Sequence, residues 1–259
     1  MITDDSHLLA ADEPPASGVV NAEGAGNAVV VCDHASNRVP HRLRALGLSA
    51  AQLASHIACD PGAFEVARRL ARHLDAPLVA SGYSRLVIDC NRPLASADSM
   101  AAVSAGVVVP GNRAITAAYR ALRTVALFEP YHRDIAGVLD RRAAAGRPCL
   151  LLSVHSFTPV LNGHHRPWQV AFAYGRDPRL ASLMLDAFAA EGGFVVGDNQ
   201  PYNVDDTTDY TLPVHGEQRR LPHVLIECRQ DLLTTAQDRE AWATRLAAAY
   251  RRSESSLAN

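Results

Sequence analysis

The chain has 259 residues, with 25 Lys and Arg residues against 27 Asp and Glu residues, so its formal net charge is −2. This near balance argues against binding to nucleic acid or to an anionic membrane, since both need a basic surface. Hydrophobic residues make up 48% of the chain, which allows a large buried core. Five cysteines without C-x-x-C spacing favour a reducing compartment. The first residues lack the features of a signal peptide and no apolar run is long enough to span a membrane, so we expect a cytoplasmic protein.

The length suits one large α/β domain. We expect three parts along the chain: a flexible lead-in over residues 1–15, a single domain over 16–252, and a polar tail over 253–259. A short strand is expected near residues 18–20. The first strong signal is the run Ala28–Cys32, which is short, apolar and rich in valine, as is typical of a buried parallel strand.

Short apolar runs then alternate with helical patterns. Strands are predicted at 78–80, 86–89, 149–154, 170–174, 194–196 and 224–228, and helices at 63–74, 114–144, 178–190 and 235–252. This alternation indicates an α/β fold with a mixed, mostly parallel sheet that is flanked by helices on both faces. Residues 198–220 form a long polar segment without periodicity, which is typical of a lid or a binding loop.

Two histidines follow or end predicted strands. His34 comes directly after the run Ala28–Cys32, and His155 ends the strand at 149–154. Because ligands of open α/β sheets bind at the carboxyl ends of the strands, these side chains can meet on adjacent strands. With a carboxylate they make a ligand set used by hydrolytic zinc. Asp60 is a candidate, although an Asp before a proline at a helix start is also an ordinary cap.

Two further positions suggest chemistry. Glu227 lies in an otherwise apolar strand, where a carboxyl is costly to bury unless it is paired or catalytic. An ion pair with Arg229 is the structural alternative. Arg85 and Arg92 flank the predicted strand at 86–89, and the planar fork of arginine suits the carboxylate of an anionic substrate.

Five segments in combination resemble the N-formylglutamate amidohydrolase family, from about residue 15 to residue 250. In chain order they are VCDHASNRVP, CDPGA, YSRLVIDCNRP, SVHSFTP and HGEQRRLPHVLIECRQDL. That family is distantly similar to zinc carboxypeptidases and to the aspartoacylase and succinylglutamate desuccinylase group. The resemblance implies a zinc-carboxypeptidase-like α/β fold and one divalent ion, Zn²⁺, held by two histidines and a carboxylate. It also implies hydrolysis of an N-acyl amino acid, with N-formyl-L-glutamate as the family substrate.

The resemblance assigns the metal ligands by position. It implies that His34 and His155 are the histidine ligands and that Asp60 is the carboxylate ligand. The carboxypeptidase pattern H-x-x-E would place a Glu where this chain has Asn37, so Asn37 is the alternative third ligand. Which of the two completes the site stays open at this point.

The remaining assignments concern catalysis and substrate binding. Glu227 is similar to the general base that activates the attacking water, and Arg85 to the arginine that polarises the scissile carbonyl. The four residues implied as substrate contacts are Asn91, Arg92, Arg229 and His215. Asn91 and Arg92 match a pair that holds the substrate carboxylate.

Three other interpretations remain. The same site can serve a different N-acyl amino acid or a short peptide, or the chain can be a non-catalytic binding protein. A cysteine hydrolase is the third, since Cys32 and Cys59 lie next to the implied ligands. The expected partner is a small-molecule substrate, with the protein a monomer or homodimer that binds neither nucleic acid nor membrane. Nucleotide binding is not indicated, because the sequence has neither a G-x-G-x-x-G after a strand nor a P-loop.

Overall fold

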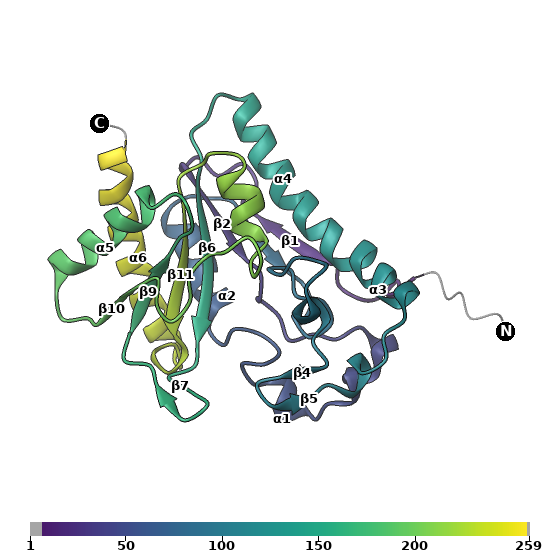
Figure 1. The fold of residues 1–259 in the computed structure, drawn as a ribbon. Coiled ribbons are helices and arrows are strands. Elements are labelled where there is room, and N and C mark those ends of the chain that lie inside the picture. Colours follow the sequence, from purple (N-terminus) through teal and green to yellow (C-terminus); the bar gives the residue numbers. More distant parts are fainter. Residues whose placement is uncertain (1–6, 258–259) are drawn as a thin grey trace.

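A seven-stranded mixed sheet forms the centre of the computed structural model, which describes residues 7–257 (Figure 1). Its strands, in spatial order, are β1 (Ser17–Val20), β3 (Leu78–Ser81), β2 (Ala28–Cys32), β6 (Leu150–Phe157), β11 (His223–Arg229), β9 (Val170–Ala173) and β10 (Val196–Asp198). The pairs β2–β3, β2–β6, β6–β11 and β9–β10 are parallel, whereas β1–β3 and β9–β11 are antiparallel. The predicted α/β class with a mixed, mostly parallel sheet is confirmed.

Helices cover both faces of this sheet, as predicted. One face carries α2 (Ala63–His73), α5 (Arg179–Glu191) and α6 (Ala236–Leu257), and the other carries α4 (Glu129–Ala144) (Figure 1). β2 shows why both faces are needed, because its side chains alternate between them. Val30 packs in the core under α2 and α6, while Val29 and Val31 pack in the core under α4. The sequence of a strand that is buried on both faces is therefore a continuous apolar run.

The long helical region predicted at 114–144 is present as three consecutive parts. α3 (Ala117–Arg123) leads through a wider helical turn, Thr124–Phe128, directly into α4. Thr116 caps the start of α3 by accepting a hydrogen bond from the backbone N–H of Tyr119.

A third apolar cluster lies under the loops and short elements beside the sheet. These elements are the helical turns His41–Gly47, α1 (Ala50–Leu53), Ala97–Met100 and Pro110–Asn112 and the strand pair β4 (Val103–Ser104) and β5 (Val107–Val108). A second small strand pair joins β7 (Val160–Leu161) to β8 (His164–His165). Two short helical turns, Leu212–Glu217 and Gln230–Leu232, flank β11.

The prediction of a strand at residues 86–89 is wrong. Leu86, Val87 and Ile88 are buried in the third cluster, but their backbone forms turns, with the N–H of Val87 bonded to the carbonyl of Ser84. Both edges of β3 are already paired, with β1 and β2, so the sheet has no place for another strand there. The apolar run therefore packs without joining the sheet, and Asp89 ends a turn rather than a strand.

The ends of the domain also differ from expectation. Leu8 is only 2% exposed, so the described part of the lead-in packs against the domain. At the other end α6 continues to Leu257, so the segment expected to be a polar tail is helical up to Leu257. Ser253, the first residue of that segment, is buried. Residues 1–6 and 258–259 of the two predicted terminal segments lie outside the described residues. Within residues 7–257, no helix combines the length and apolar character that crossing a membrane requires.

Candidate active site

Two neighbouring parallel strands bring the predicted histidines together. His34 follows β2, and His155 lies in the last part of β6, at the carboxyl ends of both strands. Asp60 comes from the loop before α2, and its backbone N–H donates to the carbonyl of His34 at 3.0 Å. This backbone bond fixes the Asp60 loop against the end of β2. All three side chains are buried.

The loop before α2 depends on a glycine. Gly62 has φ 81°, in the left-handed region, and a Cβ at this position would lie 2.6 Å from the Cβ of Leu233. The turn Asp60–Pro61–Gly62 can therefore start α2 and still direct the Asp60 carboxylate toward β6 only because residue 62 has no side chain.

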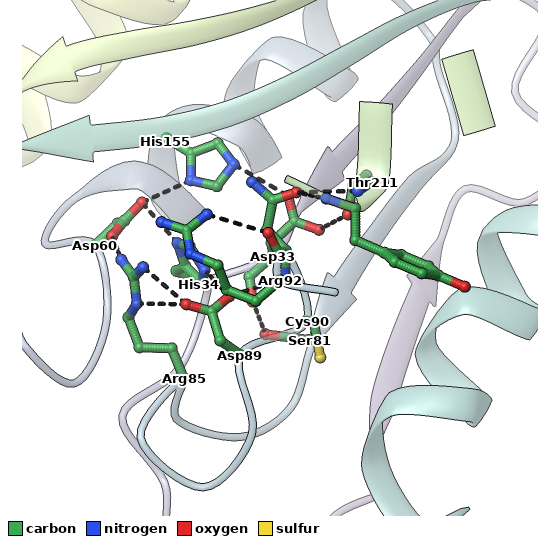
Figure 2. A network of polar contacts seen from close by, with 12 residues as sticks. Asp33, His34, Asp60, Ser81, Arg85, Asp89, Cys90, Arg92, His155 and Thr211 are labelled. Atoms are coloured by element: carbon green, nitrogen blue, oxygen red, sulfur yellow. Dashed lines mark hydrogen bonds and ion pairs between the residues drawn. The ribbon is translucent and has the colours of Figure 1, made fainter. Parts of the chain in front are cut away.

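The side chains of His34, Asp60 and His155 form a compact set of ligand atoms, all within 4.8 Å of one another. Asp60 Oδ2 lies 3.3 Å from Nδ1 of His34 and 2.9 Å from Nδ1 of His155 (Figure 2). Ligands held about 2.1 Å from a tetrahedral ion lie roughly 3.4 Å from one another, and the two distances from Asp60 to the histidines are close to this value. These residues could hold a metal ion, and the donor set leaves coordination positions open for water and substrate.

Each histidine also faces a second carboxylate through its other ring nitrogen. Nε2 of His34 lies 2.8 Å from Oδ1 of Asp89, and Nε2 of His155 lies 3.0 Å from Oδ2 of Asp33. Metal-ligating histidines usually donate their distant N–H in this way, which fixes the tautomer and the ring orientation. Asp33 and Asp89 are thus residues near the candidate metal position to which the sequence interpretation gave no role, although each lies within a segment that it singled out.

The site favours positive charge. Burial and Arg85 act to lower the pKa of His34, but Asp89 and Asp60 raise it overall. Burial likewise opposes protonation of His155, but hydrogen bonds to Asp33 and Asp60 hold its pKa well above the ordinary value. The two histidines in turn lower the pKa of Asp60 despite its burial. A cation bound at the ligand atoms would replace the protons that these carboxylates attract.

Arg85 is held between the two carboxylates near His34. Its Nε and Nη2 donate to Oδ2 of Asp89 at 3.1 and 2.8 Å, and its Nη1 approaches Oδ1 of Asp60 at 3.5 Å (Figure 2). Burial opposes the charge of Arg85, but Asp89 and Asp60 raise its pKa above the ordinary value, so the guanidinium stays charged. A fixed positive charge therefore borders the candidate metal position.

Glu227 differs from these paired groups. It lies opposite His155 in the parallel register of β11 and β6 and is buried, yet its Oε2 has no hydrogen-bond partner among the described residues. Burial raises the pKa of Glu227 from 4.5 to about 7, with His155 lowering it and Asp60 raising it further. An unpaired carboxyl with a pKa near neutrality is suited to general acid–base catalysis. Arg229, the alternative partner, pairs with Asp231 instead.

These groups line a cavity of about 310 Å³ that is bounded on one side by the long polar loop. The lining residues from the candidate site are His34, Asp60, Arg85, Asn91, Arg92, His155, Ser156, Leu225 and Glu227. The loop contributes Pro201, Tyr202, Asn203, Thr208 and Asp209. The prediction that residues 198–220 form a binding loop agrees with this placement.

Asn91 and Arg92 connect this loop to the site. The Asn91 side-chain oxygen accepts the backbone N–H groups of Tyr210 and Thr211, and its Nδ2 donates to Asp209 Oδ1 at 3.0 Å. Arg92 uses Nη1 to reach the carbonyl of Thr208 at 2.6 Å and Asp209 at 3.4 Å. Asn91 is thus occupied in holding the loop. Arg92 keeps Nε and Nη2 without a hydrogen bond to any described residue and is a candidate to bind an anion.

Two residues implied as substrate contacts at the sequence level do not line the cavity. Arg229 donates to Asp231 and to the backbone carbonyls of residues 166–168 and does not line the cavity. His215 is buried beneath the loop, with Nε2 3.0 Å from Nδ1 of His132. Burial and the charge of His132 lower the pKa of His215 to about 3. Both side chains support the fold and neither lines the cavity, and their role as substrate contacts stays a prediction.

Asn37 is not positioned as the third ligand. Its Nδ2 donates to the carbonyl of Leu53 at 2.9 Å, and Asn37 is not among the residues that line the cavity. Asp60 already occupies the position between the two histidines. The carboxylate alternative is thus the one that the geometry favours.

Comparisons with known proteins agree with this architecture. A crystal structure of a gene product from Agrobacterium tumefaciens is 38% identical, covers 98% of this chain and 100% of its own, and superposes with a TM-score of 0.95. A crystal structure of N-formylglutamate amidohydrolase from Ralstonia eutropha JMP134 is 17% identical, covers 93% of this chain and 98% of its own, and has a TM-score of 0.63, which supports the fold alone. Among curated proteins none matches. The sequence model for N-formylglutamate amidohydrolase matches residues 26–234. The chain therefore belongs to the N-formylglutamate amidohydrolase family.

Proposed function

We propose that this protein is a metal-dependent amidohydrolase that cleaves the amide of an N-acyl amino acid, with N-formyl-L-glutamate as substrate and formate and L-glutamate as products. One observation carries the proposal: Glu227, an unpaired buried carboxyl with a pKa of about 7, lines the same cavity as His34, Asp60 and His155. Membership of the family supports the amide bond as the target. The residues that surround the cavity supply proton transfer, stabilisation of negative charge and substrate orientation, as described next.

Amide hydrolysis needs an activated water, stabilisation of the carbonyl oxygen and a proton for the leaving nitrogen. A divalent ion such as zinc, when bound by His34, Asp60 and His155, lowers the pKa of a water to about 7 and polarises a carbonyl. Glu227 takes the proton of the attacking water and returns it to the leaving nitrogen. Arg85 provides a fixed positive charge for the oxygen on which negative charge develops. Its bonds to Asp89 hold that charge in place before the substrate arrives.

Substrate orientation falls to Arg92 at the loop side of the cavity. Thr208 and Asp209 hold one edge of its guanidinium, which leaves the other edge for a carboxylate. A carboxylate bound there places the acyl group toward the metal ligands, because all of these residues line one cavity of limited size. In an N-acyl amino acid the carboxylate and the amide are only a few bonds apart, so one molecule can contact Arg92 and the metal ligands at the same time.

The cysteine-hydrolase alternative is disfavoured. Cys32 is fully buried in the core, and burial with the charges of Asp60 and Asp33 raises its pKa well above the ordinary value. Burial and Asp60 raise the pKa of Cys59 to about 11. A nucleophilic cysteine needs a lowered pKa, which neither thiol has.

The proposal is tested by removing and restoring the metal. Protein stripped with a chelator should lose hydrolysis of N-formyl-L-glutamate, measured as release of primary amine, and should regain it with about one equivalent of Zn²⁺, Mn²⁺ or Co²⁺ per chain. Full activity in a preparation shown by elemental analysis to contain no metal would contradict the proposal. Metal binding without turnover on any N-acyl amino acid would instead support the binding-protein alternative.

The role of Arg92 predicts a substrate-dependent loss. Arg92→Lys keeps the charge but removes the planar fork, so kcat/KM for an N-acyl amino acid should fall. A charge-assisted hydrogen bond of this kind contributes roughly 1.5–3 kcal/mol, which corresponds to about tenfold to a hundredfold. An N-acyl amine without the carboxylate should be a poor substrate for both proteins and change little. Equal losses on both substrates would show that Arg92 acts only through the loop that it holds.

A further inference from the structure

Asp33 is held from several directions beneath His155. Its side chain is 1% exposed and accepts hydrogen bonds on both oxygens. Oδ1 receives the hydroxyl of Thr211 at 2.5 Å and that of Tyr131 at 2.9 Å. Oδ2 lies 3.0 Å from Nε2 of His155 (Figure 2). The hydroxyl of Ser153 donates to the same Oδ2 at 3.0 Å. The carboxylate therefore cannot rotate without breaking contacts that come from α4, β6 and the binding loop, which contains Thr211.

When it is neutral, as a metal ligand must be, the ring of His155 has two alternative hydrogen-bonding states in this environment. Its Nε2 lies 3.0 Å from the hydroxyl of Ser153 as well as from Asp33. If Nε2 carries the proton, it donates to Asp33, and the lone pair of Nδ1 points to the candidate metal position beside Asp60. If Nδ1 carries the proton, Nε2 accepts from Ser153, and the ring cannot ligate through Nδ1. Only the first state is compatible with metal binding at this site.

Thr211 biases this choice through Asp33. Its side chain is fully buried, and its hydroxyl approaches the oxygen of Asp33 that does not face His155. A donor at Oδ1 keeps Oδ2 turned toward Nε2, where a carboxylate oxygen can accept a proton but repels a lone pair. The backbone N–H of Thr211 is at the same time bonded to Asn91, which lies next to Arg92. The hydroxyl is therefore placed by the same segment that completes the cavity.

We propose that Thr211 is a positioning residue for the metal site: through Asp33 it holds His155 in the tautomer whose Nδ1 lone pair faces the metal. Thr211 is not among the residues that line the cavity, and Tyr131 assists it from α4 at the same carboxylate oxygen. The inference rests on the metal centre of the proposed function but not on the identity of the bond that is cleaved.

The test measures metal affinity, with Zn²⁺ alone as the probe. Thr211→Val keeps the shape of the side chain and removes the hydroxyl, so the dissociation constant, measured by competition with a chromophoric chelator, should rise on the order of tenfold. Thr211→Ser restores the hydroxyl and should stay within about twofold of the parent. Thr207→Val is the matched control, because Thr207 lies in the same loop, is exposed, and does not contact Asp33.

A second readout reports the tautomer directly. In the zinc-loaded parent, nitrogen-15 NMR of the ring should show His155 with a protected proton on Nε2, and in Thr211→Val that proton should exchange faster with solvent. Tyr131→Phe removes the other hydroxyl at Oδ1 and should weaken zinc binding in the same direction, which covers the case in which Thr211→Val does not fold. Affinity within twofold of the parent for both variants overturns the positioning role alone. A parent that binds no divalent ion overturns both this role and the metal-dependent function.

Discussion

Replacing Glu227 by glutamine is expected to lower kcat for amide hydrolysis by roughly 10²–10⁴-fold while the protein retains its metal. Glutamine keeps the size of the side chain but cannot accept a proton from water. Glu227 is not one of the three residues whose ligand atoms cluster, so metal content should stay at the parent level. Turnover and elemental analysis on the same preparation separate the two effects.

The control for this experiment is a carboxyl remote from the cavity. Glu23 is exposed, and Glu23→Gln should leave kcat unchanged. If Glu227→Gln keeps turnover within a few-fold of the parent, Glu227 is not the base, and the proton must leave by another route. If the variant loses its metal, the role of Glu227 is to hold the metal ligands in place, and its raised pKa is a consequence of burial without a role in catalysis.

The two histidines of the candidate metal site could be singled out from the sequence because the strands that precede or carry them have strong signals. The runs that form β2 and β6 are continuous and apolar, as buried parallel strands must be, and a polar residue at the end of such a strand stands out. What the sequence could not show is that β2 and β6 are neighbours. Sheet order depends on contacts distant along the chain, so the meeting of His34 with His155 was an expectation that required the structure.

Asp33 and Asp89 illustrate what local patterns miss. Asp33 adjoins His34 in sequence, but it hydrogen-bonds His155, 122 residues away. Asp89 follows an apolar run that packs as a turn, and only this turn directs its carboxylate to His34 and to Arg85. A carboxylate that orients a ligand is recognised by what it faces, and no periodicity or spacing in one sequence contains that information.

Arg229 and His215 show what a family match does not distinguish. Both lie within segments that match the family, and the match gave no reason to separate residues that face the cavity from those that support it. Arg229 stands two residues beyond Glu227, but its guanidinium is used by Asp231 and by three backbone carbonyls. His215 stacks on His132, with ring centroids 5.2 Å apart, below the loop. Placement relative to the cavity is a tertiary property, and it required coordinates.

The raised pKa of Glu227 also predicts how the stability of the metal-free protein depends on pH. In the unfolded chain the carboxyl ionises near 4.5, whereas in the folded protein it ionises at about 7. The folded state therefore binds the proton more tightly, and stability falls as pH rises between these two values. Above pH 7 the difference corresponds to about 3 kcal/mol, since each pKa unit is worth about 1.4 kcal/mol.

Glu227→Gln removes this titration. Measured by urea unfolding in the presence of a chelator, the free energy of unfolding of the variant minus that of the parent should increase by about 2–3 kcal/mol from pH 5 to pH 8. Glu23→Gln provides the baseline, because it is the same exchange at an exposed position. Zinc should reduce the effect, since a cation next to Glu227 favours the ionised carboxylate in the folded state. A difference that does not change with pH would mean that Glu227 is already ionised at pH 5, and the argument for it as a base near neutrality would fail.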